Sequence, residues 1–319
     1  MLPDDESETA DRTTIGATPP DDAGDADRAM APLEDRIGAF TTYTVAADFL
    51  TLREIYSGNF ARMREEDWAR RSERRVVGWT RLQALAHVGA MTLLYNQAIR
   101  DVVAGRAASI TGLSNRTQLK AFNQAAIEAR THIPAEELVT SFLDALSHAA
   151  ELVAPLTAET MLRRVPLPHF SSPPTVAELF GSSLAHAGIV HATQLAVSRA
   201  RPIWIYFQPG MMRRQITRFI HLRGLNYWPS RAGQLHATIA IQIAGQGGGS
   251  WIIRLSPEGA QGRIGRVRTN DVTFSFPSAD LFCRMMCYQT SPWREWFFHR
   301  LHVSGNLNLA RRTLTLFKP

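Results

Sequence analysis

The side chains best suited to chemistry in this sequence are histidines that fall within predicted helices. His87 lies in a segment whose pattern predicts a helix over residues 80–103. His186 and His191 lie in a second segment, over residues 175–199. A zinc ion that keeps one position open takes three protein ligands from His, Cys, Asp and Glu. The three imidazoles are therefore candidate ligands, and a histidine satisfied in the core or at the surface is the alternative for each.

The spacing of the two later histidines decides whether all three can meet. Residues four apart on a regular helix lie about 40° apart around its axis, whereas residues five apart lie about 140° apart. His186 stands five residues before His191, and the position four before is Ala187, which cannot bind a metal. A single π-type bulge near Gly188 would absorb the extra residue and turn His186 inward. Two alternatives stay open: a bulged three-histidine site with His87, or a degenerate site that has lost a ligand.

Other reactive patterns favour structural roles. Cys283 and Cys287 have i,i+4 spacing, which indicates two buried reduced cysteines rather than a thioredoxin-type pair. Residues 245–249 (GQGGG) lead into a predicted strand, so they predict a hairpin turn and not a phosphate cradle. Residues 293–302 (WREWFFHRLH) predict a core helix covering a sheet, with ligand stacking as the alternative. Nucleophile-elbow, P-loop and Rossmann motifs are absent from the sequence.

Composition and charge exclude several classes of protein. Apolar residues make up 45% of the 319 residues, yet no uninterrupted apolar run is long enough to span a membrane. The first 30 residues lack the pattern of a secretory signal, and two cysteines do not make a disulfide scaffold, so we expect a cytoplasmic protein. Residues 1–35 carry a net charge of −9 and predict a disordered acidic tail, which leaves +15 on residues 36–319. That basic charge is almost all arginine, without a recognisable nucleic-acid motif, so neither nucleic acid nor membrane is an expected partner.

The periodicity of the remaining chain changes near residue 202. Residues 36–202 predict a four-helix bundle, and residues 203–319 predict a smaller α+β domain with an antiparallel sheet. The bundle helices are expected at 43–64, 80–103, 117–155 with a break at Pro134, and 175–199. In the second part, helices are expected at 211–222, 279–289 and 307–317, and strands at 235–245, 250–256, 271–276 and 301–305.

Two stretches carry a family resemblance. Residues 75–89 (RVVGWTRLQALAHVG) resemble the second-helix signature of the DinB-like superfamily, with a Trp-Thr pair and a His seven residues after the Thr. Residues 175–196 (TVAELFGSSLAHAGIVHATQLA) resemble its fourth helix, with His191 followed by Thr193-Gln194. Members include mycothiol-dependent maleylpyruvate isomerase and thiol S-transferases. The second part resembles a sterol-carrier-type domain through Asp271-Val272-Thr273 and residues 303–310 (VSGNLNLA).

The resemblance implies a metal and a cosubstrate. The family holds a divalent metal, usually zinc, by one ligand from the second helix and two from the fourth, which points to His87, His191 and His186. It implies a mycothiol-type thiol as cosubstrate, made nucleophilic as the thiolate. Arginines would hold the carboxylates or sugar of thiol and acceptor. The unranked candidates are Arg81, Arg100, Arg254 and Arg284.

The sequence thus favours a thiol-dependent S-transferase or isomerase, with catalytic His87 and His191 in a pocket between the bundle and the α+β domain. Its partners would be a small-molecule thiol and an acceptor substrate, and a homodimer stays open. The alternative is a non-catalytic carrier of an apolar small molecule, with the bundle as a scaffold around a degenerate metal site.

Overall fold

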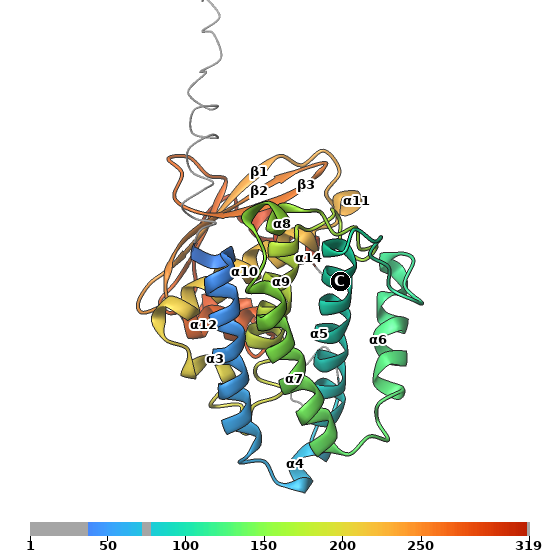
Figure 1. Cartoon of the computed structure of the whole chain (residues 1–319). Coiled ribbons are helices and arrows are strands. Elements are labelled where there is room, and N and C mark those ends of the chain that lie inside the picture. The colour runs from blue at the N-terminus through green and yellow to red at the C-terminus, as the bar shows by residue number, and fades with distance from the viewer. Residues whose placement is uncertain (1–37, 72–77, 318–319) are drawn as a thin grey trace, which may run out of the picture.

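The computed structural model describes residues 38–71 and 78–317. Long helices form the body of the molecule, and a five-stranded sheet lies across one end of them (Figure 1). This confirms the predicted fold class, a helical bundle followed by an α+β part. The predicted acidic tail, residues 1–35, lies outside the described residues.

Four helices run side by side in the bundle (Figure 1). They are α3 (Thr42–Phe60), α5 (Arg81–Val103), α7 (Ala135–Val153) and α9 (Val176–Ala185). Short helices between them are α4 (Glu65–Ala69), η1 (Arg116–Gln118), α6 (Leu119–Glu128) and α8 (Ala158–Leu162). The first helix was expected to reach Arg64 but ends at Phe60, because the Arg64 amide donates to the Asp67 carboxylate and starts α4.

Capping boxes fix the start of both histidine-bearing helices. The Gln83 amide donates to Thr80 Oγ1 over 3.2 Å, and the Thr80 amide donates to Gln83 Oε1 over 2.9 Å. Thr175 and Glu178 exchange the same two bonds at the start of α9. Because such a box satisfies two amides that a helix start otherwise leaves unpaired, it fixes the first turn, and with it the face on which later residues lie.

The second half of the chain, residues 203–317, alternates short helices with strands. Its helices are η3 (Ile203–Tyr206), α10 (Pro209–Leu225), α11 (Pro229–Ala232), α12 (Ala279–Met286), α13 (Pro292–Phe297) and α14 (Leu307–Leu316). Its strands are β1 (Ala237–Ile243), β2 (Gly249–Ser256), β3 (Gly259–Ile264), β4 (Val272–Phe276) and β5 (His302–Gly305), in the sheet order β3-β2-β1-β4-β5.

The sheet differs from the predicted antiparallel one at its centre. β4 pairs with β1 in parallel, while the other three pairs are antiparallel. Residues 265–271 carry the chain back from the end of β3 to the start of β4, so that β4 runs in the direction of β1. The sequence analysis missed β3, whose Gly259 and Gly262 weaken the strand signal. A Cβ on Gly262 would lie 2.6 Å from Ile220 Cγ2, so the glycine lets α10 approach the sheet.

Helix α10 joins the two halves of the molecule. It packs against α9 of the bundle on one side and against β2 and β3 on the other. The buried apolar side chains accordingly form one cluster that runs from Ala39 to Phe317. The domain boundary predicted near residue 202 falls at η3, and the core continues across it.

The aromatic segment 293–302 does not form the predicted core helix. Trp293, Phe297 and Phe298 are 53%, 72% and 56% exposed. The buried side chain of α13 is instead Glu295, which accepts one hydrogen bond from the Thr290 hydroxyl and pairs with Arg300. Because the polar side chain anchors this short helix, the aromatic rings are left at the surface.

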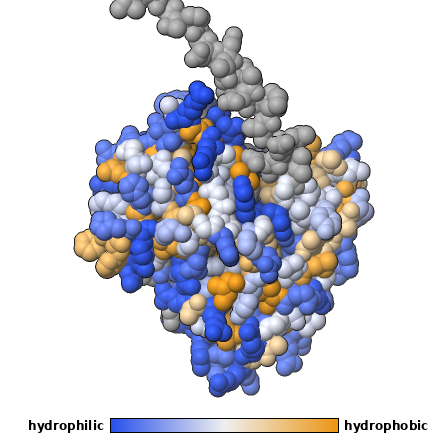
Figure 2. Space-filling model, turned by 90° about the vertical axis from the view of Figure 1, so that its left-hand side faces the viewer, coloured by the Kyte–Doolittle hydropathy of each residue, from blue (hydrophilic) through white to orange (hydrophobic). Residues whose placement is uncertain are grey.

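The surface is otherwise mixed. On the face shown in Figure 2, hydrophilic residues predominate and hydrophobic ones form small patches between them. None of the helices within residues 38–71 and 78–317 has the length and apolar character needed to cross a bilayer. Cys283 and Cys287 are buried and reduced, as predicted.

A buried ion cluster ties the first helix to α10. Asp48 of α3 accepts hydrogen bonds from Arg214 at 2.7 and 2.5 Å and from Arg218 at 2.5 Å. The Arg218 side chain is fully buried and also donates to the Ala39 carbonyl. Burial lowers the pKa of Arg218 to about 10, which leaves it protonated at neutral pH. The cluster is thus a charged contact between the two halves of the chain, in which Asp48 and Arg218 are buried and Arg214 is partly exposed.

Replacing Asp48 by Asn should destabilise the protein by about 3–5 kcal/mol, because it leaves the buried Arg218 charge unpaired. The matched control is Asp101→Asn, whose partner Arg106 is 60% exposed and whose loss should cost about 0–1 kcal/mol. Urea unfolding of both variants measures the difference. Equal small losses would show that the cluster does not hold the halves together.

Candidate metal centre

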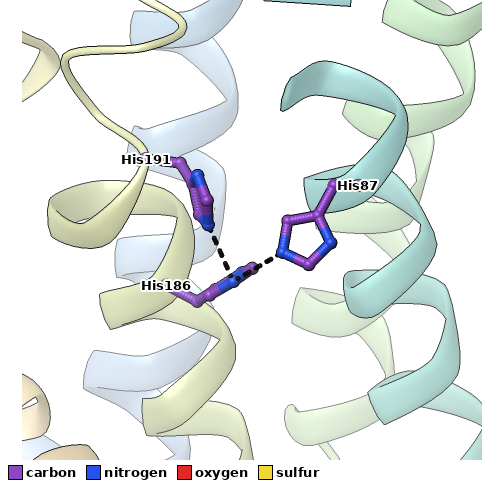
Figure 3. A group of neighbouring side chains, drawn as sticks. All are labelled: His87, His186 and His191. Carbon is purple, nitrogen blue, oxygen red and sulfur yellow. Dashed lines mark hydrogen bonds between the residues drawn. The ribbon is translucent and has the colours of Figure 1, made fainter. Parts of the chain in front are cut away.

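Three imidazoles meet where α5 faces the end of α9. His87 lies on the second turn of α5, and its Nε2 is 3.2 Å from Nε2 of His186. Nε2 of His191 lies 3.0 Å from the same atom. Figure 3 shows His87 reaching across to the other two side chains, and the candidate ligand atoms of all three lie within 4.8 Å of one another.

A π-turn brings His186 and His191 together. The α-helix α9 ends at Ala185, and residues His186–Val190 (η2), the π-turn, follow it directly. Its defining bond runs from the His191 amide to the His186 carbonyl, an i→i+5 bond of 3.0 Å. The bulge that the five-residue spacing required near Gly188 is therefore present in the structure.

Gly188 lies within the π-turn, where it allows close packing against the second half of the chain. A Cβ at that position would lie 3.3 Å from both Gln215 Nε2 and Phe207 Cζ, tighter than ordinary packing. Both neighbours come from the second half of the chain and are buried. The π-turn is thus packed closely on the side away from His87.

The fourth helix was expected to continue to about Arg199, and that expectation is wrong. After the π-turn the chain forms turns whose carbonyls are bonded by side chains from other helices. Asn59 of α3 donates to the Leu195 carbonyl, and Arg81 of α5 donates to the carbonyls of Ala196 and Val197. These bonds replace those that a longer helix would have made within itself.

Two further residues complete the surroundings of the histidines. The side-chain oxygen of Gln194 bonds Nδ1 of His191, so that Nδ1 carries the proton and Nε2 is left to face the other imidazoles. The Trp79 ring lies 4.8 Å from the ring of His87 and stacks on His191 at 6.2 Å between centroids. The sequence analysis assigned neither residue a role, although both belong to the motifs that carried the resemblance.

The donor set suits a zinc ion. Tetrahedral zinc with Zn–N bonds of about 2.0–2.1 Å places its nitrogens about 3.3 Å apart, close to the two distances observed. A neutral imidazole that carries its proton on Nδ1 presents a lone pair at Nε2, so three Nε2 atoms that face one another can ligate one cation. His87 and His191 are buried and His186 is half-buried, so a cation between them would lie largely out of contact with solvent.

A basic cavity of about 310 Å³ adjoins the histidines. Gln194, bonded to His191, forms part of its wall, together with Gln289 from the second half of the chain. Its charged lining is arginine: Arg70, Arg71, Arg81 and Arg199. None of the described residues that wall this cavity is acidic, although Asp67 outside the wall pairs with Arg70 at 2.9 Å and lies 4.0 Å from Arg81.

The four predicted arginines lie in different places. Arg81 walls the basic cavity. Arg284 lines a neighbouring cavity of about 400 Å³ and bonds the carbonyl of Arg199, a residue of the basic cavity, and that of Ala200. Arg100 lines a separate cavity of about 920 Å³ between α5 and α6. Arg254 lines another, of about 640 Å³, beside β2 and β3. The structure thus brings Arg81 and Arg284 toward the histidines but not the other two.

Comparison with solved structures identifies the fold. The chain superposes on the crystal structure of the mycothiol-dependent maleylpyruvate isomerase with a TM-score of 0.53, covering 82% of this chain and 92% of that one at 11% identity. A histidine-to-alanine mutant of that isomerase gives the same score and coverage at 10% identity. The chain has the isomerase fold.

The second half also matches a family by sequence. Residues 225–318 match the SCP-2 sterol transfer family. No curated protein sequence matches the chain. The isomerase fold and the sequence match of residues 225–318 agree with the two parts of the resemblance seen in the sequence.

Another buried histidine, His169, lies apart from this centre. His169 stacks on Tyr95, whose hydroxyl lies 3.2 Å from its Nε2, and packs against Phe170. Burial, with a smaller contribution from the positive charge of Arg116, lowers the pKa of His169 to about 4. It is therefore neutral in the folded protein at neutral pH.

His169 should make stability fall with acid. Its stabilising contribution is complete above pH 6.5 and is lost as the pH falls from 6.5 to 4, because the unfolded chain then binds a proton that the folded protein excludes. The loss should approach about 3 kcal/mol. This loss of unfolding free energy should be absent in His169→Gln. The control His132→Gln, which changes an exposed histidine, should show the same loss as the wild type. Unfolding free energies at pH 7 and 4.5 that change equally in wild type and His169→Gln would contradict this.

Proposed function

We propose that the protein is a thiol-dependent S-transferase or isomerase with zinc, or another divalent metal, held by His87, His186 and His191. The observation that carries this proposal is the π-turn, which places two imidazoles five residues apart on one side of a helix beside a third. Their three Nε2 atoms face one another at distances that a single tetrahedral cation could span. A metal ligand set explains why they face one another.

The chemistry follows from three neutral ligands and an open position. A zinc ion held in this way would bind the sulfur of a small thiol and lower its pKa, so that the thiolate is present at neutral pH. Gln194 keeps the His191 proton on Nδ1, away from the metal side. Trp79 covers two of the rings and limits access of water from its side.

The basic cavity points to an anionic acceptor or thiol. A carboxylate held by arginines beside the thiolate would place an electrophilic carbon within reach of the sulfur. The sulfur lone pair forms the new C–S bond, and in a transfer the leaving group departs with its bonding electrons. In an isomerisation the same addition to a conjugated double bond is reversed after rotation, and the thiol is released. The solved isomerase of the same fold is described as mycothiol-dependent, which supports mycothiol as the thiol to test first.

Metal content tests the proposal directly. Protein purified without chelators should contain about one zinc per chain, and His87→Ala, His186→Ala and His191→Ala should each lose it. Zinc affinity should fall by more than the roughly 10–100-fold that loss of a supporting residue costs. The control is His132→Ala, which changes an exposed histidine.

The matching activity is consumption of mycothiol with a model electrophile such as 1-chloro-2,4-dinitrobenzene. It should require zinc and disappear in the three variants but not in the control. A zinc-free wild type, or a zinc content unaffected by His186→Ala, would refute the three-histidine centre.

A second candidate function is carriage of an apolar small molecule. The match of residues 225–318 to the SCP-2 sterol transfer family supports it. In this case the protein should bind fatty-acid or sterol probes with a negative heat-capacity change, and His186→Ala should leave the affinity unchanged. Calorimetry without detectable heat for either probe class would remove this candidate.

A further inference from the structure

Two side chains bond to carbonyl groups of the π-turn, one from each half of the chain. Tyr56 of α3 donates its hydroxyl to the Ala187 carbonyl over 2.7 Å, and Cys287, at the end of α12, donates its thiol to the Ile189 carbonyl over 2.8 Å. We infer that Tyr56 and Cys287 are positioning residues that hold His186–Val190 in the π-turn and thereby keep His186 in the metal centre. The inference rests on the proposed function and names the residues that make its centre possible.

The hydrogen-bond register of the turn carries the first step. In a regular α-helix the His191 amide would donate to the Ala187 carbonyl, four residues earlier. Here it donates to the His186 carbonyl, and the Ala192 amide donates to that of Ile189. Neither of these amides reaches Ala187. The carbonyl that loses its α-helical donor through the bulge is thus the one that Tyr56 bonds.

Tyr56 is well placed to select the bulged form. Its side chain is fully buried, and its ring packs between the rings of Phe60 and Phe142, with centroid distances of 5.2 and 5.1 Å. These contacts fix the position of the hydroxyl independently of α9. Burial raises the pKa of Tyr56, so the hydroxyl remains a donor. In a straight helix the Ala187 carbonyl would accept from the His191 amide and the hydroxyl would be its second donor, whereas in the π-turn the hydroxyl takes the place of that amide. The hydroxyl therefore favours the π-turn over the straight helix.

Cys287 acts on the same turn from the other side. Its side chain is fully buried, and its donation to Ile189 is a contact between the second half of the chain and the π-turn. Cys283, one turn earlier on α12, is equally buried and offers a matched comparison without that bond. The metal centre is in this way made to depend on the second half, although all three histidines belong to the first.

The functional consequence is a rotation of His186. If the turn relaxed to a regular helix, the hydrogen bonds would shift from i→i+5 to i→i+4. That shift of one residue would rotate the preceding side chains by about 100° relative to His191. His186 would then leave the centre, with Ala187 next to His191 in its place. Loss of a donor far from the histidines should therefore appear as loss of metal affinity.

The closing experiment measures zinc affinity of the full-length protein by competition with a chromophoric chelator. Tyr56→Phe should weaken zinc binding about 10–100-fold, the range expected for a residue that supports a ligand. The matched control is Tyr95→Phe, which removes another buried hydroxyl, bonded to His169 and not to the π-turn. That control should keep wild-type zinc affinity even if its melting temperature falls as far as that of Tyr56→Phe.

The cysteine provides rescue by a conservative variant. Cys287→Ala should weaken zinc binding, Cys287→Ser should restore most of it because a hydroxyl can donate to the Ile189 carbonyl, and Cys283→Ala should have no effect. The visible absorption of Co²⁺-substituted protein gives a second readout, since loss of His186 from the ligand set changes the ligand-field bands. A purely structural role would lower stability without changing those bands.

The outcomes separate the inference about Tyr56 and Cys287 from the proposed function. A wild type that binds zinc through the three histidines, with Tyr56→Phe and Cys287→Ala unchanged in affinity and Co²⁺ spectrum, overturns this inference and leaves the proposed function standing. A wild type that does not bind zinc overturns both, because there is then no centre for these residues to hold. Weakened binding in both variants, with unchanged binding in both controls, supports the inference.

Discussion

The structure of the candidate centre depends on one hydrogen bond, from the His191 amide to the His186 carbonyl. That i→i+5 bond adds one residue to a helical turn and moves His186 from a face about 140° away to the face of His191. His87 then needs only the ordinary contact between α5 and α9 to complete the group. The ligand set therefore follows from a local backbone irregularity on an otherwise regular bundle.

The surroundings of this irregularity compensate for it. Tyr56 and Cys287 bond carbonyls of the π-turn, Asn59 and Arg81 bond those of the turns after it, and Gly188 allows close packing of the second half. These contacts come from both halves of the chain, whose apolar residues form one core. At the candidate site, side chains from both halves of the chain thus bond the carbonyls where α9 ends early.

Much of this could be predicted from the sequence, because the informative signals are local. The periodicity of the helices, the Thr80 cap and the Gly-rich hairpin at 245–249 all appear where expected. The five-residue histidine spacing around Gly188 pointed to a bulge but could not choose between bulged and straight helices. That choice depends on Tyr56, 131 positions away. The parallel β1–β4 pair was missed for the same reason, since it joins strands far apart in the sequence. The aromatic segment 293–302 was misjudged because its apolar residues suggested burial, whereas local bonds from Thr290 and Arg300 bury Glu295 instead.

The measurement that tests the central claim most directly is X-ray absorption spectroscopy at the zinc edge of the loaded protein. The account predicts three imidazole nitrogens at about 2.0–2.1 Å from the zinc and one oxygen as the fourth ligand. When the thiol is added, its sulfur should replace that oxygen at about 2.3 Å. A spectrum with two imidazoles or fewer would contradict it, because the π-turn would then not bring His186 to the metal.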